Sequence, residues 1–322
     1  MTDYRAIVFD GGGVRGLITA SWVEELEELL GHPVYNYVNY IAGTSTGSIL
    51  AAALACGIPA QEVVELYQKY AITIFPEYSR RILSRIKRLF LEGPSAPKYN
   101  DKGLTHELKR AFGEKQFGDL KVKTLITSYN VFQREPVIFK SWDSLHAEYP
   151  LWEVIKASCS APVYFPAHLM KLSGYYMPLV DGGVVANNPS ACLLADIAKD
   201  IRLKTKCLDT SQVILGSFGA GQYTRPISIN DSREWGALEW ALPIIDVLFD
   251  GSSDAISYVC RQMIPENQYY RFQVALDKSC NDLDNASTEN LYALLNIAHS
   301  YLYGSAQGIK KLKKFANLLQ RV

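Results

Sequence analysis

Two strand-turn-helix units follow one another at the start of this 322-residue chain. In the first, the apolar run Arg5–Phe9 leads through the glycine-rich turn Asp10–Gly16 into a helix expected at Leu17–Leu30, where apolar side chains recur on one face. In the second, a strand expected at Tyr37–Ala42 leads into an alanine-rich helix at Ile49–Cys56. Two successive units of this kind predict an α/β fold with a parallel sheet covered by helices on both faces.

The rest of the chain extends this pattern, and residues 1–322 are expected to form a single domain. Prolines and glycines interrupt residues 75–103, which favours a lid-like insertion in a core of about residues 4–221. Residues 222–322 are expected to be a mainly helical extension. Further elements are expected as strands at Val122–Phe132, Val137–Phe139, Val213–Phe218 and Tyr269–Val274, a helix at Leu151–Ser158, and a hairpin at Leu169–Val180 that turns at Ser173-Gly174.

The turn between the second strand and its helix reads Gly43-Thr44-Ser45-Thr46-Gly47. A GxSxG turn between a strand and a helix forces a sharp bend that exposes the serine hydroxyl at the sheet edge, and Gly43 and Gly47 avoid clashes there. The N-terminus of the following helix favours negative charge nearby. Ser45 is therefore a candidate nucleophile, although the pentapeptide alone fits a helix-capping serine equally well.

The first turn carries three consecutive glycines, Gly11, Gly12 and Gly13. Their amides are expected above the carboxyl ends of neighbouring strands, where they would form an oxyanion hole. Gly11, Gly13 and Gly16 also fit a dinucleotide-binding GxGxxG, but the second strand lacks the acidic residue that this site needs, and no GK[ST] of a phosphate-binding loop follows. Arg15 is either a surface helix residue or a contact to a substrate phosphate.

A nucleophilic serine needs a base, and the histidines are poorly placed to provide one. In a Ser-His-Asp order the histidine would follow the acid, and of the five histidines only His299, within a predicted helix, follows Asp181. His168 is the other weak candidate. Asp181 leaves the predicted hairpin and is followed by Gly182 and Gly183, which allow a tight turn beside the serine. Asp181 is therefore the expected base, against the simpler interpretation as a turn aspartate.

Three segments together resemble the signatures of the patatin-like phospholipase family, in order and at similar spacing. They are Asp10–Gly16, Gly43–Gly47 and Asp181–Pro189, supported by Ala157–Pro166 and the strand Val213–Phe218. The resemblance covers about residues 4–221. It implies a three-layer α/β/α sandwich with a mostly parallel central sheet, and release of fatty acid from glycerolipids without metal or other cofactor.

Carried over position by position, the resemblance makes Ser45 the nucleophile and Asp181 the base of a Ser-Asp dyad. Gly12 and Gly13 become the oxyanion donors, with Arg15 beside them. Ser48 departs from the family pattern, because many members have a further glycine there. The expected activity is that of a phospholipase A-type acyl hydrolase acting on glycerophospholipids or lysolipids. An acyltransferase with the same dyad and a nucleotide-binding pseudoenzyme are the alternatives.

The charge balance bears on partners. Thirty-three Lys and Arg residues balance thirty-three Asp and Glu residues, so the chain has no net charge to attract nucleic acid. Nucleic acid is not expected as a partner. Two basic amphipathic segments, at residues 80–91 and 309–322, could contact the surface of a membrane that presents the acyl-lipid substrate. Each could equally be a solvated helix face.

The same sequence indicates where the protein acts. The six cysteines form no CxxC pair, which favours a reducing compartment. No signal peptide and no membrane-spanning run is recognisable, because the most apolar stretch, Ser48–Ile58, is half of what a bilayer needs. The expected location is the cytoplasm or a membrane periphery, with signal-independent secretion also open.

Overall fold

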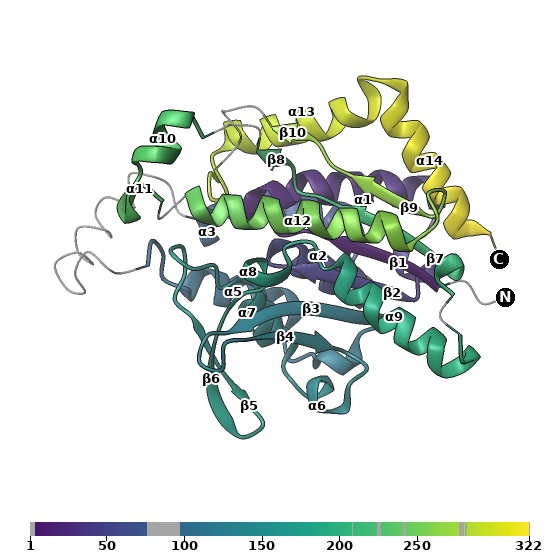
Figure 1. Cartoon of the computed structure of the whole chain (residues 1–322), viewed down its shortest axis with the longest axis horizontal. Helices are drawn as coiled ribbons and strands as arrows, with labels where there is room; N and C mark the ends of the chain where they lie inside the picture. The colour runs from purple at the N-terminus through teal and green to yellow at the C-terminus, as the bar shows by residue number, and fades with distance from the viewer. Residues whose placement is uncertain are drawn as a thin grey trace.

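The computed structural model describes residues 4–75, 97–207, 209–223, 227–240, 243–276, 280 and 282–321. An eight-stranded sheet lies at its centre, in the order β5-β6-β3-β2-β1-β7-β9 with β4 also paired to β3 (Figure 1). The strands of this sheet are β1 Tyr4–Phe9, β2 Tyr40–Thr44, β3 Lys123–Asn130, β4 Glu135–Lys140, β5 His168–Leu172, β6 Tyr175–Asp181, β7 Val213–Phe218 and β9 Tyr269–Phe272. A short pair of strands, β8 Gln222–Tyr223 and β10 Ala275–Leu276, forms a second sheet.

Helices connect and cover these strands. The longer ones are α1 Gly16–Leu30, α2 Thr46–Cys56, α3 Ala60–Ile74, α5 Lys102–Phe112, α7 Leu151–Cys159, α9 Ser190–Thr205, α12 Pro243–Met263, α13 Thr288–Tyr303 and α14 Ala306–Gln320. The shorter ones are α6 Ser144–Ala147, α8 Gly183–Ala186, α10 Ile229–Glu234 and α11 Ala237–Trp240. In the described residues no helix is long and apolar enough to cross a membrane.

The sheet is mixed. Its strands β3, β2, β1, β7 and β9 run parallel, whereas β4, β6 and β5 are joined to it by antiparallel pairing. The antiparallel end contains the expected hairpin, which turns at Ser173 and Gly174 with φ angles of 47° and 90°. Two positive φ angles at the centre of a two-residue turn match the twist of the flanking strands. The predicted α/β fold is confirmed, with this antiparallel end added to the parallel sheet.

Alternation along the buried strands produces the two helical layers. In β1, Ile7 and Phe9 face a core shared with α1, α2, α13 and α14, whereas Ala6 and Val8 face a second core shared with α9 and α12. Side chains in a strand point alternately to opposite faces, so a strand buried on both sides must be apolar throughout. Figure 1 shows α9 and α12 on the viewer's side of the sheet. The sandwich of three layers follows from this pattern.

Several boundaries differ from those expected. The second strand begins at Tyr40 rather than Tyr37, because Val34–Asn36 forms a 3₁₀ turn, and its helix begins at Thr46 rather than Ile49. Residues 76–96 of the expected insertion, including the basic segment 80–91, lie outside the described residues. The C-terminal extension contributes β9 to the main sheet, which ties it to the core.

Candidate active site

A strained corner presents Ser45 between β2 and α2. The serine has φ 53° and ψ −127°, a region that residues with side chains rarely occupy. The corner is tight: a Cβ atom at Gly43 would lie 2.2 Å from the Gly47 carbonyl oxygen, and one at Gly47 would lie 2.4 Å from the carbonyl oxygen of Phe9. Only glycine fits at both places, so the local sequence forces the hydroxyl outward at the sheet edge.

Strand β3 brings Asp181 to this corner. Because β4 occupies one edge of β3, strands β2 and β6 must share its other edge. Thr44, the last residue of β2, pairs with Thr127, and Asp181, the last residue of β6, pairs with the next residue, Ser128. The two antiparallel strands therefore meet end to end, and the structure brings Ser45 and Asp181 together.

The Asp181 carboxyl is completely buried. Burial raises its pKa to about 7, and hydrogen bonds from the Ser45 hydroxyl and the Gly183 amide act in the opposite direction. The Gly183 N–H donates to Oδ1 at 2.7 Å. Oδ2 has no fully aligned hydrogen bond within the described part of the chain, so the serine contact is a loose one, as is common before a substrate binds.

The raised pKa makes the stability of the protein pH-dependent. Well below the unfolded pKa of 3.8 the carboxyl is protonated in the folded and the unfolded chain. As pH rises through this value only the unfolded chain loses the proton, so the free energy of unfolding falls until about pH 7. The substitution Asp181→Asn removes the buried charge. We expect it to raise the free energy of unfolding at pH 8 by up to about 4 kcal/mol, and to change it little at about pH 3. Urea unfolding of the native and Asp181→Asn proteins at both pH values measures this difference. A difference in free energy of unfolding that is equal at the two pH values would contradict the prediction.

The amides of the glycine loop are not equivalent. The Gly11 N–H donates to the Asn187 carbonyl at 3.1 Å and is already used. The amides of Gly12 and Gly13 bond to no acceptor among the described residues. The Gly12 carbonyl accepts from the backbone N–H and Nε of Arg15, at 3.1 and 3.3 Å. A trans peptide points its N–H opposite to its C=O, so Arg15 fixes the direction of the Gly13 N–H. Of the expected trio Gly11, Gly12 and Gly13, the Gly11 amide is therefore already bonded, and only the amides of Gly12 and Gly13 are available to an oxyanion.

Arg15 is not a surface residue, because its side chain is only 4 % exposed. Burial lowers the pKa of its guanidinium, and the carboxylates of Asp250 and Asp246 on α12 oppose this effect. The guanidinium stays charged, as arginine does in proteins. Arg15 thus stabilises the glycine loop through its two hydrogen bonds to the Gly12 carbonyl.

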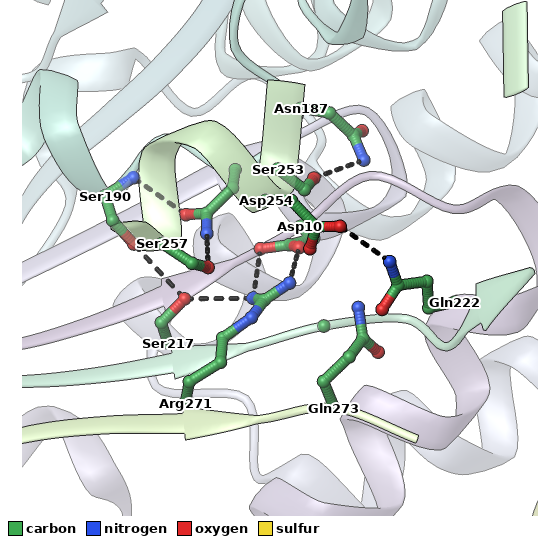
Figure 2. A network of polar contacts seen from close by, with 12 residues as sticks. Asp10, Asn187, Ser190, Ser217, Gln222, Ser253, Asp254, Ser257, Arg271 and Gln273 are labelled. Atoms are coloured by element: carbon green, nitrogen blue, oxygen red, sulfur yellow. Dashed lines mark hydrogen bonds and ion pairs between the residues drawn. The ribbon is translucent and has the colours of Figure 1, made fainter. Parts of the chain in front are cut away.

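A buried ion pair holds Asp10, the first residue of the glycine loop (Figure 2). Arg271 of β9 forms a bidentate ion pair with Asp10, at 2.9 and 2.5 Å, and donates to the Ser217 hydroxyl at 3.0 Å. Asn187 donates to the Ser253 hydroxyl of α12 at 3.1 Å. Asp10 and Arg271 are both buried, and removing one member of such a pair leaves an uncompensated charge. The C-terminal part of the chain therefore fixes the loop.

An apolar cavity opens beside the serine. Ser45, Asp181 and Gly13 line it together with side chains of α2, α3 and α5. Those helices contribute mainly the apolar residues Ile49, Ala53, Val63, Leu66, Ala71, Ile74, Leu104, Leu108 and Phe112. Along α2 the lining runs from Ser45 to Ala53, two helical turns or about 12 Å. An apolar lining that extends this far from the serine suits a hydrocarbon chain.

The remaining motif glycines and the two histidines are also placed. Gly16 begins α1, and Gly182 and Gly183 turn β6 into α8. His168 is buried at the start of β5, and His299 is exposed on α13 beside Tyr303. Among the described residues that line the cavity, none is a histidine. No group of three metal-ligating side chains occurs in the described ranges.

Three supporting residues were not predicted from the sequence. Ser158 on α7 accepts the Ser45 N–H at 2.8 Å, and its segment was noted without a role. Asn187 lies within the third motif, but its carbonyl bond to the loop left no sequence signal. Arg271 lies 261 positions from Asp10, beyond any motif. For α5, the spacing of Leu104, Leu108 and Phe112 could have indicated a helix face.

Comparison with known sequences decides the family. The sequence model of the patatin-like phospholipase family matches residues 7–191, more than half of the chain. The chain belongs to the patatin-like phospholipase family. The resemblance expected from the three motifs is confirmed, and this patatin-like chain carries all three within or just beside the site described above.

Relatives extend the match beyond the motifs. Patatin-like protein 2 of rice (Oryza sativa subsp. indica) is 28% identical, over 91% of this chain and 82% of its own length. Patatin-2-Kuras 4 of Solanum tuberosum is also 28% identical, over 96% and 91%. Membership of this phospholipase family supports lipid acyl hydrolysis by the patatin-like chain.

Solved structures that match this chain have little sequence in common with it. Human GIVD cytosolic phospholipase A2 is 12% identical, with a TM-score of 0.48 over 99% of this chain and 61% of that one. VipD from Legionella pneumophila is 13% identical, with a TM-score of 0.44 over 91% and 67%. The patatin-like chain thus spans about two thirds or less of these structures.

Proposed function

We propose that this protein hydrolyses fatty-acyl esters of glycerophospholipids or lysolipids through a Ser45-Asp181 dyad. The observation that carries the proposal is the meeting of a strained serine, a buried carboxyl with a pKa near 7 and an apolar cavity, beside two amides that bond to no acceptor among the described residues. A base with a pKa near neutrality is well matched to accepting a proton at physiological pH.

The reaction has two halves. The Ser45 oxygen forms a bond to the ester carbonyl carbon while its proton passes to Asp181, and the amides of Gly12 and Gly13 bind the oxyanion. The C–O bond to the glycerol then breaks, and Asp181 returns the proton to the leaving alcohol. Water attacks the acyl-enzyme, again giving its proton to Asp181, and Ser45 is regenerated as the fatty acid leaves.

Fatty-acid release from phosphatidylcholine vesicles tests the proposed activity. We expect release by the native protein and a return to background with Ser45→Ala, because the acyl-enzyme cannot form. A fatty-acid yield that is equal for the two proteins would refute the proposal. Glycerophosphocholine among the products would show that the lysolipid is also a substrate.

The cavity predicts a dependence on acyl-chain length. Ala53 lies two turns of α2 beyond Ser45, so Ala53→Phe should fill the distant part of the cavity and leave the part near the serine open. We expect turnover of p-nitrophenyl palmitate to fall about tenfold or more, and that of p-nitrophenyl butyrate to change little. Butyrate is the internal control. An equal loss on both esters would indicate general damage rather than a shortened cavity.

An acyltransferase would use the same dyad and differ only in the acceptor. Adding a lysolipid to the vesicle assay separates the two: diacyl product formed at the expense of free fatty acid favours transfer. A nucleotide-binding pseudoenzyme is less compatible with the site, because Gly13 faces an apolar cavity rather than a polar groove.

A further inference from the structure

A basic pocket lies far from Ser45, between the end of α12, the start of β9 and α14. We define it by Arg261, Asn267, Tyr270, Lys310, Lys311 and Lys314, which line it together with Glu266 and Arg271. Its volume is about 1060 Å³. That is at the upper end of small-molecule sites, and is room for a ligand with more than one charged group.

The basic pocket and the serine lie at opposite ends of the sheet. Strand β9 runs parallel to β7, β1 and β2, so the start of β9 lies at the end where those strands begin. Ser45 follows the end of β2. Figure 1 shows α14 on the side of the molecule where β1 begins. A ligand in this pocket is therefore separate from a substrate at the serine.

Positive charge in the basic pocket is not balanced. Within the described residues, Arg261, Lys310, Lys311 and Lys314 form no ion pair, and Glu266 supplies the only carboxylate of the described lining. Arg271 turns its guanidinium away to Asp10 and is not available to a ligand. Four cations against one carboxylate in a concave surface concentrate a positive potential.

The charged form of Lys311 is destabilised by its burial and by the cations around it. It is half-buried, and its ammonium donates to the Arg271 carbonyl oxygen. Burial lowers the pKa of Lys311, and the nearby charges of Arg261 and Arg271 lower it further. An anion placed between Arg261 and Lys311 would relieve this repulsion, whereas a solvated helix face would not gather cations from two separate elements.

The geometry points to a binding site for a phosphate-bearing anion with at least two negative charges. Arginine forks bind phosphate oxygens in pairs, and lysine ammonium groups act as point charges around them. The pocket offers both, with Asn267 and Tyr270 as neutral partners. The chemistry fits a free polyphosphate and a phosphorylated lipid headgroup alike. The substrate ester does not bind in this pocket.

Calorimetry with tripolyphosphate tests this site. The Ser45→Ala protein is used throughout, so that binding does not depend on the proposed hydrolysis and no lipid is consumed. We expect Lys310→Glu/Lys314→Glu to weaken binding at least about tenfold, because two ligand contacts become repulsive. Added salt should weaken binding as well.

The matched control is Lys199→Glu/Lys313→Glu, which changes the net charge equally. Lys199 lies on α9, and Lys313 lies on α14 outside the lining. Binding by this variant should equal that of the parent. Equal losses in the two double variants, or no binding of tripolyphosphate and of vesicles alike, would overturn the site.

Flotation with phosphatidylcholine vesicles distinguishes the source of the anion. Vesicles containing phosphatidic acid present a clustered phosphate monoester, and pure phosphatidylcholine vesicles do not. Binding to the former that is lost in the Lys310→Glu/Lys314→Glu variant and kept in the control assigns the pocket to a headgroup. Binding of tripolyphosphate alone, with the same dependence on the two lysines, assigns it to a soluble anion.

Discussion

Ser45→Ala and Asp181→Asn should each lower kcat on a p-nitrophenyl acyl ester by at least about 10³-fold. The first removes the attacking oxygen, and the second removes the group that accepts its proton. Members of a catalytic pair act as a unit, so the double variant should be little worse than either single one. Initial rates give kcat for each variant, and circular dichroism checks that each variant is folded.

The control for this prediction is His168→Asn. His168 is the other base that the sequence left open; burial lowers its pKa to about 4, so it is neutral at the assay pH, and it does not line the cavity. Its replacement should leave kcat within about twofold of the native value. If His168→Asn were as inactive as Asp181→Asn, the dyad would have to give way to a histidine-dependent mechanism.

Gly13→Ala should cost about 10²–10³-fold in kcat. A Cβ atom at this position would lie 2.0 Å from the Leu283 carbonyl oxygen, and the residue has φ 56°. The loop must therefore shift, which turns the Gly12 and Gly13 amides away from the forming oxyanion. The measured quantities are kcat and KM on the same ester, with the loss expected in kcat.

Gly113→Ala is the matched control for the loop. Gly113 also has φ 56°, but a Cβ there would meet nothing within 4 Å. Both substitutions place a side chain at a positive φ, at a cost of about 1–3 kcal/mol, and only Gly13→Ala displaces the amides. A folded Gly13→Ala protein with a kcat equal to that of Gly113→Ala would show that the amides of this loop do not bind the oxyanion.

The sequence predicted the parts of the site that are local. Ser45 is held by a five-residue turn whose two glycines are required by close backbone contacts, and such constraints are written in neighbouring positions. Asp181 was predicted from the end of a hairpin with its glycine pair. The apolar run Arg5–Phe9 was likewise expected as a strand, and β1 is buried on both faces, which demands such a run.

What the sequence left out depends on distant contacts. The Gly11 amide was counted as a donor because nothing in the turn shows that the Asn187 carbonyl will occupy it. Arg271 reaches Asp10 from the C-terminal part of the chain, outside the matched motifs. Arg15 was left between two interpretations because its burial depends on α12, whose position no local pattern gives.

In the proposed mechanism the buried Asp181 carboxyl activates Ser45 for acyl transfer. Intact-protein mass spectrometry after a fluorophosphonate tests it most directly, with peptide mapping of the adduct at several pH values. We predict one adduct on Ser45, formed at a rate that rises about tenfold per pH unit up to about pH 7 and then levels, and that is abolished by Ser45→Ala and at least 10²-fold slower in Asp181→Asn. An adduct on another residue, or labelling that Asp181→Asn leaves unchanged, would contradict the account.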